Sequence, residues 1–442
     1  MTRLFAFIAN TCFLIILFGC ESKYLEVDED ILQSRFYEPY ITKYVGLQQS
    51  TVLYLDHSTC VIEAVRNSEV FRRLRPDLGQ YCDTLRMIKG DSFESIPLNR
   101  EDNRVSEALE TIETDIPYAD IRKAVFDICN DNQQAILISD CESYANGRFL
   151  DLEPYMSEPF KNWLADGHSI YIITEPYTEI HNGNSYEKKR FYIVFTDDRM
   201  KSSISNIINP RINELVTEGV CSWFKMTNSD IRVQVGKSDL IAGDLSYDAK
   251  YYNGFEYIEI DDSWSDIRRY VMKLDKYGEK IPDEEPEALI RNIKFNNGEN
   301  YIVNNIDILA TNITSKYIAL SDSTVSEQSV DMSNAFLLDK EALKKNIINV
   351  LVTDKIFTDG YLMGKEYGGN LIRLDFLIPD NNQSVHLKEY DSSVFQWQSV
   401  WVPETAICVS RSIDNALRDA NVVPSSPKRS VIHTIFLKTE DY

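Results

Sequence analysis

Short apolar runs alternate with amphipathic stretches from residue 51 to about residue 225, which predicts strands alternating with helices. Two of the runs, Thr51–Asp56 and Gln134–Ser139, consist of apolar residues, and each brings the chain to an acid. Buried parallel strands have this composition. The further strands predicted here are Ser169–Thr174 and Arg190–Thr196, and the helices are Val61–Leu74, Tyr118–Cys129, Pro159–Ala165 and Ser202–Val216. Gly79–Met87 is expected to be helical and Asp91–Asn103 a loop. The pattern favours an α/β fold with a doubly wound, mostly parallel sheet.

The pattern changes after about Lys225, where short β-type runs are separated by Asn, Asp, Gly and Ser. This predicts a β-rich C-terminal domain over residues 226–442, for which a sandwich is the default arrangement. The expected strands are Ile231–Val235, Phe255–Ile260, Ala288–Phe295, Asp307–Ala310, Leu371–Ile378 and Val431–Lys438, and the expected helices are Glu341–Val352 and Ser412–Ala420.

The N-terminal block from Leu4 to Phe18 is apolar, follows Arg3 and leads into Leu17-Phe18-Gly19-Cys20. It is shorter than the roughly 20 residues of a spanning helix. It resembles the lipobox of bacterial lipoproteins, which implies a signal peptide over residues 1–19 and lipidation of Cys20. An acidic tether over residues 20–48 would follow. The alternative is an uncleaved N-terminal anchor. The lipoprotein interpretation places the protein in the cell envelope, held to a membrane by acyl chains on Cys20.

The chain of 442 residues has 69 acidic and 46 basic side chains, a net charge of −23 and a pI near 4.7. This balance argues against a nucleic-acid partner, because phosphate binding needs clustered Lys and Arg. A solvated acidic surface or a cation site fits it better.

Candidate chemistry gathers where the first and fourth expected strands end. Asp56-His57-Ser58-Thr59-Cys60 follows the first strand, Thr114 lies in the loop before the Tyr118–Cys129 helix, and Asp140 ends the Gln134–Ser139 strand. In a doubly wound sheet these strands are neighbours, so Asp56 and Asp140 are expected to face one crevice.

These residues resemble the metal-ion-dependent adhesion site of von Willebrand factor A domains, whose motif is Asp-x-Ser-x-Ser, a loop Thr and a later Asp. Asp56, Ser58, Thr114 and Asp140 match it, within a region of about residues 49–225. The resemblance implies an Mg²⁺ or Mn²⁺ site that accepts a carboxylate from a partner. Cys60 stands in place of the second Ser, and a thiol is a poor Mg²⁺ ligand. Asp56 could instead hydrogen-bond only to backbone N–H groups.

Cys60 and Cys141 each lie just beyond one of these two strands. An exported protein meets an oxidising compartment, so a disulfide between them is one interpretation, and two small buried thiols are the other. A zinc site formed by His57, Cys60, Cys141 and an acid is a third.

The sequence contains no Gly-x-Ser-x-Gly, His-Glu-x-x-His or phosphate-binding glycine motif, so a non-enzymatic role is favoured. The leading hypothesis is a lipid-anchored envelope protein whose A-domain-like head binds a protein or acidic ligand, with a divalent cation as a candidate cofactor. One alternative is a metal-dependent hydrolase using the same crevice. Another is a structural or glycan-binding lipoprotein with a metal-free head, for which Trp397 and Trp401 are candidate binding aromatics.

Overall fold

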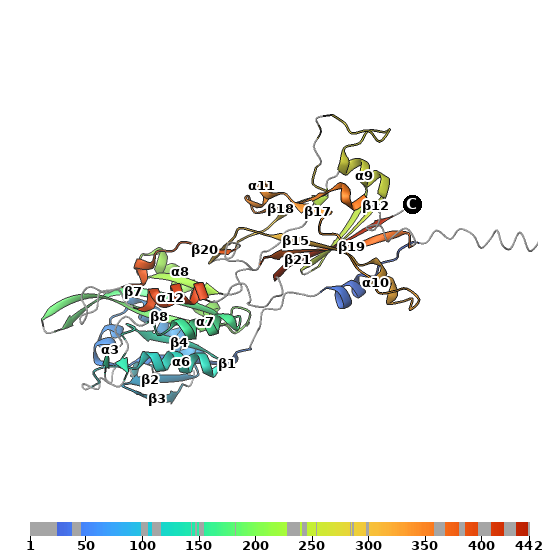
Figure 1. The fold of residues 1–442 in the computed structure, drawn as a ribbon. Helices are drawn as coiled ribbons and strands as arrows, with labels where there is room; N and C mark the ends of the chain where they lie inside the picture. Colours follow the sequence, from blue (N-terminus) through green and yellow to red (C-terminus); the bar gives the residue numbers. More distant parts are fainter. Residues whose placement is uncertain are drawn as a thin grey trace, which may run out of the picture.

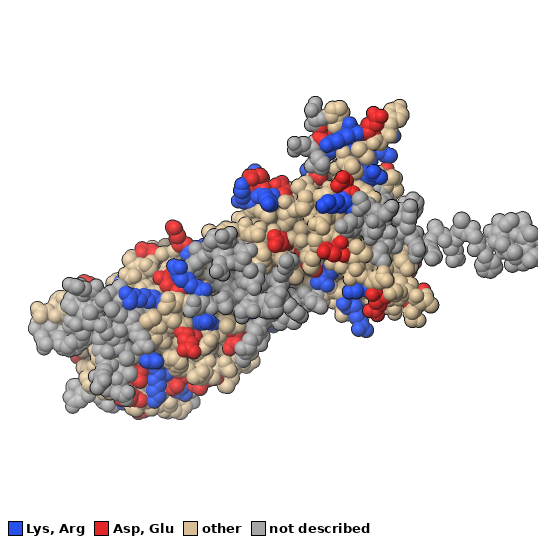
Figure 2. Space-filling model, in the orientation of Figure 1, with Lys and Arg blue, Asp and Glu red and all other residues tan. Residues whose placement is uncertain are grey.

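The computed structural model describes residues 24–37, 46–98, 105–107, 116–142, 144–145, 148–149, 154–181, 183–227, 239–240, 245–252, 254–282, 284, 287–297, 300–357, 367–379, 385–396, 408–419 and 430–440. Its elements form two lobes, with the first sheet and its helices at one end and a β-rich lobe at the other (Figure 1). Acidic and basic side chains are interspersed over the described part of the face in Figure 2.

The first lobe contains a seven-stranded sheet in the order β3-β2-β1-β4-β8-β7-β9. Its strands are β1 (Gln48–Asp56), β2 (Thr84–Lys89), β3 (Ser92–Pro97), β4 (Gln133–Ser139), β7 (Ser169–His181), β8 (Asn184–Thr196) and β9 (Ser222–Thr227). Strand β1 pairs in parallel with β2 and β4, and every other pair is antiparallel. The predicted α/β class is confirmed, but the prediction of a mostly parallel sheet was wrong, because only the β2-β1-β4 pairs of this sheet are parallel and the β7–β8 hairpin and the edge strands pair antiparallel.

Helices cover both faces of this sheet because β1 and β4 are apolar on both sides. Val52 and Tyr54 of β1 belong to one apolar cluster, and Leu53 and Leu55 belong to another. The first cluster includes α6 (Ile121–Asp131) and α7 (Ser157–Ala165), and the second includes α3 (Thr59–Arg66), α4 (Glu69–Tyr81) and α8 (Ile204–Thr217).

Three local predictions for this lobe were wrong. The predicted helix Val61–Leu74 is two helices, because the first ends at Arg66 and Ser68 caps the start of the second, where its Oγ accepts the backbone N–H of Phe71 at 2.8 Å. The expected helical turn at Gly79–Met87 is helical only to Tyr81, where α4 ends, and its second part is the start of β2; the expected loop at Asp91–Asn103 contains β3. These two strands form an antiparallel hairpin at the sheet edge. Strand β3 is mostly exposed, so its polar sequence lacks the apolar signal of a strand.

The strands predicted as Ser169–Thr174 and Arg190–Thr196 are the inner ends of one long β7–β8 hairpin. Strand β9 pairs with residues 169–174 of β7, and β4 pairs with residues 191–195 of β8. Residues 175–190 therefore continue beyond the sheet as a two-stranded ribbon. This ribbon, called the β7–β8 ribbon below, reaches the end of the molecule away from the second lobe (Figure 1).

The second lobe is β-rich, as predicted. A six-stranded sheet has the order β11-β12-β21-β19-β15-β16, and a four-stranded sheet has the order β10-β13-β18-β17. The strands of the larger sheet are β11 (Tyr247–Tyr251), β12 (Phe255–Ser263), β15 (Asp307–Asn312), β16 (Val330–Asp331), β19 (Gly369–Ile378) and β21 (Ser430–Glu440). Those of the smaller are β10 (Asp239–Leu240), β13 (Ile290–Lys294), β17 (Phe336–Leu338) and β18 (Ile347–Val352).

Minor elements complete the described chain: β5 (Tyr144–Ala145), β6 (Arg148–Phe149), β14 (Tyr301–Val303), β20 (Val385–Leu387), α9 (Trp264–Met272), α10 (Thr314–Ala319), α11 (Lys340–Leu343), η3 (Asp354–Phe357) and η5 (Ser392–Phe395). The predicted helix Glu341–Val352 was wrong in its second half, where β18 alternates buried and intermediate residues. The predicted strand Ile231–Val235 lies outside the described residues, as do Trp397 and Trp401.

Residues late in the chain pack against the first lobe. Helix α12 (Cys408–Asp419) contacts α7, and Asn415 Nδ2 donates to Ser157 Oγ at 3.3 Å. The Phe224 ring of β9 stacks on Tyr390 with centroids 4.7 Å apart. The C-terminal region therefore contributes elements to both lobes.

The segment after residue 23, which the sequence suggested to be a tether, docks on the second lobe. It contains α2 (Glu29–Ile31) and the π-helical turn η1 (Leu32–Phe36). Leu25 and Leu32 are buried in a cluster with Phe255 of β12 and Phe436 of β21. The Tyr24 hydroxyl donates to Glu259 at 3.0 Å. No helix within the described ranges is both long and apolar enough to cross a membrane.

Replacing Leu137 by Ala tests the packing of β4. Leu137 is fully buried, so Leu137→Ala is expected to lower the free energy of unfolding by about 2–5 kcal/mol in chemical denaturation. Leu337→Ala in β17 is the matched control because Leu337 is 49% exposed, and its effect should be under about 1 kcal/mol. Equal effects of the two substitutions would contradict the assignment of β4 to the core.

Candidate functional site

The two predicted strand-end acids meet at one edge of the first sheet. Leu55 of β1 pairs with Ile138 of β4 in parallel register, so Asp56 and Asp140 emerge at the same edge. Ser139 Oγ donates a hydrogen bond to Asp56 Oδ2 at 2.7 Å. Both carboxyl groups belong to buried residues, Asp56 being 2% and Asp140 3% exposed. The structure therefore brings together the pair that the sequence predicted.

Of the other two predicted ligands, the structure describes only Ser58. Ser58 is buried and immediately precedes α3, and its backbone N–H donates to Asp56 Oδ1 at 3.0 Å. This is the backbone-binding role that the sequence left open for Asp56. Thr114 lies outside the described residues. The described part of its loop is close, because the backbone N–H of Thr59 donates to the Ile116 carbonyl at 3.1 Å.

Asp140 is held by donors on both of its carboxylate oxygens. Oδ1 accepts the backbone N–H of Glu142 at 3.0 Å. Oδ2 accepts the Lys188 ammonium at 3.2 Å and the Tyr177 hydroxyl at 3.4 Å. The intervening residue, Cys141, has a φ of 61°, a backbone conformation that non-glycine residues rarely adopt. The chain thus turns sharply between two acids that face one lysine.

Lys188 is surrounded by three acids. Its Nζ lies 3.2 Å from Asp140, 3.5 Å from Glu142 and 2.6 Å from Glu179. Its own side chain is 2% exposed, and those of Glu142 and Glu179 are 11% and 10% exposed. We call Asp140, Glu142, Glu179 and Lys188 the lysine cluster. It lies where β4 ends and the β7–β8 ribbon begins.

Burial and repulsion between neighbouring acids raise the pKa values of Asp56 and Glu142. Burial, with the charge of Asp140, raises the pKa of Asp56 to about 6. The same two causes raise the pKa of Glu142 to about 8, although Lys188 opposes them. Burial alone would lower the pKa of Lys188, but Asp140, Tyr177 and the two glutamates outweigh it and raise that pKa. Lys188 therefore remains an ammonium ion inside the lobe.

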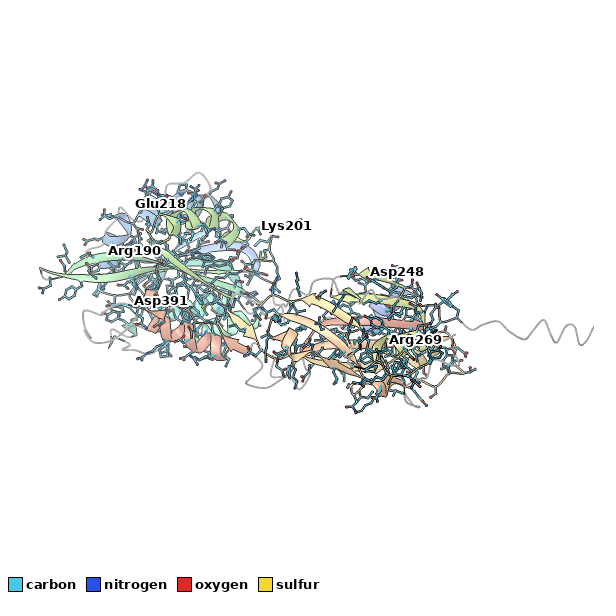
Figure 3. The ribbon with its side chains drawn as sticks, turned by 90° about the horizontal axis from the view of Figure 1, so that it is seen from above. Arg190, Lys201, Glu218, Asp248, Arg269 and Asp391 are labelled. Atoms are coloured by element: carbon cyan, nitrogen blue, oxygen red, sulfur yellow. The ribbon has the colours of Figure 1, made fainter. Side chains whose placement is uncertain are left out.

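A second buried ion pair anchors the base of the ribbon. Arg190 donates to Glu175 Oε2 at 2.8 Å, and the two residues are cross-strand partners. Glu175 also accepts the hydroxyl of Ser68 at 2.5 Å and the backbone N–H of Glu69 at 3.1 Å, at the N-terminus of α4. Negative charge is favourable at that helix end. Arg190 is labelled in Figure 3, inside the first lobe where the ribbon leaves it.

The cysteines do not form the arrangements considered from the sequence. No disulfide joins Cys60 to Cys141: Cys60 is exposed, and Cys141 is buried. Although the residue is exposed, partial desolvation of its sulfur, with the nearby charge of Glu179, raises the pKa of the Cys60 thiol to about 11, so it is a thiol rather than a thiolate ligand at neutral pH. Within the described ranges, Glu259, Asp261 and Glu440 of the second lobe are the one set of three ligand side chains close enough for one ion. His57, Cys60 and Cys141 form no such set.

A divalent ion does not fit the predicted ligands as they lie. Both carboxylates already accept hydrogen bonds on each oxygen, and Asp140 accepts one of them from an ammonium ion. A hard divalent ion would have to share Asp140 with that positive charge. Cys60 supplies no oxygen ligand. The geometry instead supports a metal-free, ion-paired cluster.

Three residues of the lysine cluster, Lys188, Glu142 and Glu179, were not predicted from the sequence. A signal was present in the alternation of Glu175, Tyr177 and Glu179 along β7 with Lys188 and Arg190 along β8, since residues two apart share a face of a strand. Charged residues on a face that packs inward must find partners there. The predicted strands ended before these positions, so the alternation was not used.

Comparison of the chain with protein-family models, with curated proteins and with solved structures gives no match.

Replacing Asp56 by Asn tests the electrostatics of the site. An aspartate has a pKa of about 4 in an unfolded chain, whereas that of Asp56 is about 6 in the fold. The folded state binds more protons between these values, so the free energy of unfolding should fall as the pH rises from about 4 to about 6. Asp56→Asn should remove part of this fall in urea titrations at several pH values. Asp248→Asn, at an exposed acid, is the control, and identical pH profiles for Asp56→Asn and wild type would refute the assignment.

Proposed function

We propose that the protein is a non-enzymatic lipoprotein of a bacterial envelope, anchored through Cys20, whose first lobe binds another protein. The second lobe would lie next to the membrane, and the first lobe would be presented away from it. The observation that carries this proposal is the position of the docked N-terminal segment. Tyr24 and Leu25 pack on the β-rich lobe, at the opposite end of the molecule from the β7–β8 ribbon (Figure 1).

The short segment between Cys20 and Tyr24 supports the proposed anchor. Only three residues separate Cys20 from Tyr24, and Tyr24 is fixed to the second lobe by two contacts. Its hydroxyl donates to Glu259, and its ring lies 3.9 Å from the Lys438 ammonium. An extended chain covers at most about 3.6 Å per residue. Acyl chains on Cys20 would therefore hold the second lobe near the lipid surface.

The proposal includes a first lobe of the von Willebrand factor A type and a second lobe of the sandwich type. The first is supported by the parallel pairing of β1 and β4 and by the acids at their shared edge. The second is supported by the apolar cluster that Ile258 of β12 and Ile372 of β19 share with Ile293 of β13 and Val350 of β18.

The proposed contact surface is the β7–β8 ribbon. Ile180 is 75% exposed near its turn, which has no sheet neighbour on either side within the described chain. The base of the ribbon is fixed by the Arg190–Glu175 pair and the lysine cluster, so its position is set before a partner arrives. Preorganisation of this kind lowers the entropy cost of binding. A partner with an apolar surface would cover Ile180.

Replacing Cys20 by Ala tests the anchor. Cys20→Ala should move the protein from the membrane fraction to the soluble fraction of the envelope and abolish incorporation of labelled fatty acid, because acyl chains supply the membrane affinity. Cys12→Ala is the control within the same leader and should change neither result. Fatty-acid labelling that survives Cys20→Ala would exclude the proposed anchor.

A photo-crosslinking amino acid at position 180 tests the contact surface. Placed there in the native cell, it should give a discrete protein adduct, and Ile180→Asp in the unlabelled protein should weaken capture of that same partner at least tenfold. The matched control is position 320, where Leu320 is 49% exposed on the second lobe. Adducts at position 320 but none at position 180 would contradict the proposed surface.

A further inference from the structure

We infer that the ammonium group of Lys188 is the resident cation of the first lobe, so that the edge formed by β1 and β4 works without a divalent ion. The inference rests on the proposed function only in treating this lobe as the binding head. Lys188 lies outside the Asp-x-Ser-x-Ser motif that suggested a metal site. Whether its ammonium group or a divalent ion neutralises the acids can be tested without knowing the partner.

The geometry matches an ammonium ion. Lys188 Nζ donates a hydrogen bond to Asp140 Oδ2 at 3.2 Å, and the carboxyl groups of Glu142 and Glu179 lie within ion-pair distance of the same nitrogen. These acids come from separate places: Asp140 ends β4, Glu142 follows the turn at Cys141, and Glu179 lies on β7. One lysine therefore ties the edge of the parallel strands to the base of the ribbon.

The lysine is not a surface residue that has folded over the site. Lys188 is on β8, directly opposite Tyr177 of β7, and the pairing of these strands continues inward to residue 169. The position of its Cα is thus set by the central hairpin of the sheet. Its side chain is 2% exposed, so an ion entering from solvent would have to displace a buried charge. Removing a buried ammonium from its partners is strongly unfavourable.

A neighbouring residue offers a matched contrast. Lys189 points to the other side of the ribbon, where its Nζ donates to the backbone carbonyls of Ser393 and Val394 at 2.7 and 2.6 Å. The two lysines are adjacent in sequence and equal in charge, yet only Lys188 contacts the acids. A substitution at Lys189 therefore changes the net charge without changing the cluster.

The cluster and its neighbour Asp56 contain four carboxyl groups and one ammonium. A divalent ion is consequently the direct competitor of Lys188, and a competition experiment is the appropriate test. We expect that Mg²⁺ or Mn²⁺, titrated into the wild-type protein lacking its leader, gives no saturable heat that Asp56→Asn removes, which separates this edge from the acids Glu259, Asp261 and Glu440 of the second lobe. Lys188→Met removes the ammonium but keeps most of the side-chain volume, so it should lower the thermal midpoint by leaving the acids of the cluster without their cation.

Two controls define the outcomes. Lys188→Arg keeps the charge and Lys189→Met leaves the cluster intact, so both should keep a thermal midpoint closer to that of the wild type than Lys188→Met does. Saturable Mn²⁺ binding to the wild type that weakens at least tenfold in Asp56→Asn would overturn the inference. This wild-type titration decides the question even if Lys188→Met does not fold. A folded Lys188→Met with an unchanged thermal midpoint would also count against it, because the acids would then not depend on the ammonium group.

Crosslinking from position 180 in the presence of a chelator separates this inference from the proposed function. An adduct that persists in chelator supports both. An adduct that is lost in chelator overturns metal independence and leaves the proposed binding surface in place. The absence of an adduct in either condition counts against the binding surface, while the calorimetric result for Lys188 still stands.

Discussion

Parallel pairing of β1 with β4 imposes the constraint from which the rest of the first lobe follows. The register brings Asp56 and Asp140 to one edge, and the apolar faces of both strands require helices above and below. The acids are therefore buried as a consequence of sheet packing. Buried carboxylates need partners, and the fold supplies them from Ser139, backbone N–H groups and Lys188. The β7–β8 hairpin thus supplies, through Lys188, the positive charge that stabilises the buried acids.

A buried lysine that pairs with acids from two strands also occurs in the second lobe. Lys438 of β21 is 2% exposed and pairs with Glu259 of β12, while Glu440 lies 3.6 Å from its Nζ. Tyr24 covers this lysine and bonds to the same glutamate. In both lobes one buried lysine joins acids from separate strands. In the first lobe it lies at the base of the β7–β8 ribbon, and in the second it lies under the docked N-terminal segment.

Sequence patterns predicted the strands that are buried on both faces and the helices that are amphipathic. Strands β1 and β4 and helix α6 were found because their apolar positions are continuous or regularly spaced. The exposed edge strand β3 was missed because its residues are mostly polar. Strand β18 was mistaken for the continuation of a helix because its apolar residues follow shortly after the short helix α11. The pairing of Asp56 with Asp140 was predictable from topology, whereas the contacts of Lys188 depend on a long β7–β8 hairpin that continues beyond the two strands predicted there.

A lysine, and not a metal ion, neutralises the acids at the end of β4. A crystal structure of the protein grown with Mn²⁺, with anomalous scattering recorded at the manganese edge, tests this assignment. We expect no anomalous peak beside Asp56 or Asp140, and Lys188 Nζ within ion-pair distance of Asp140, Glu142 and Glu179. A manganese peak between Asp56 and Asp140, with the Lys188 side chain turned away, would contradict it.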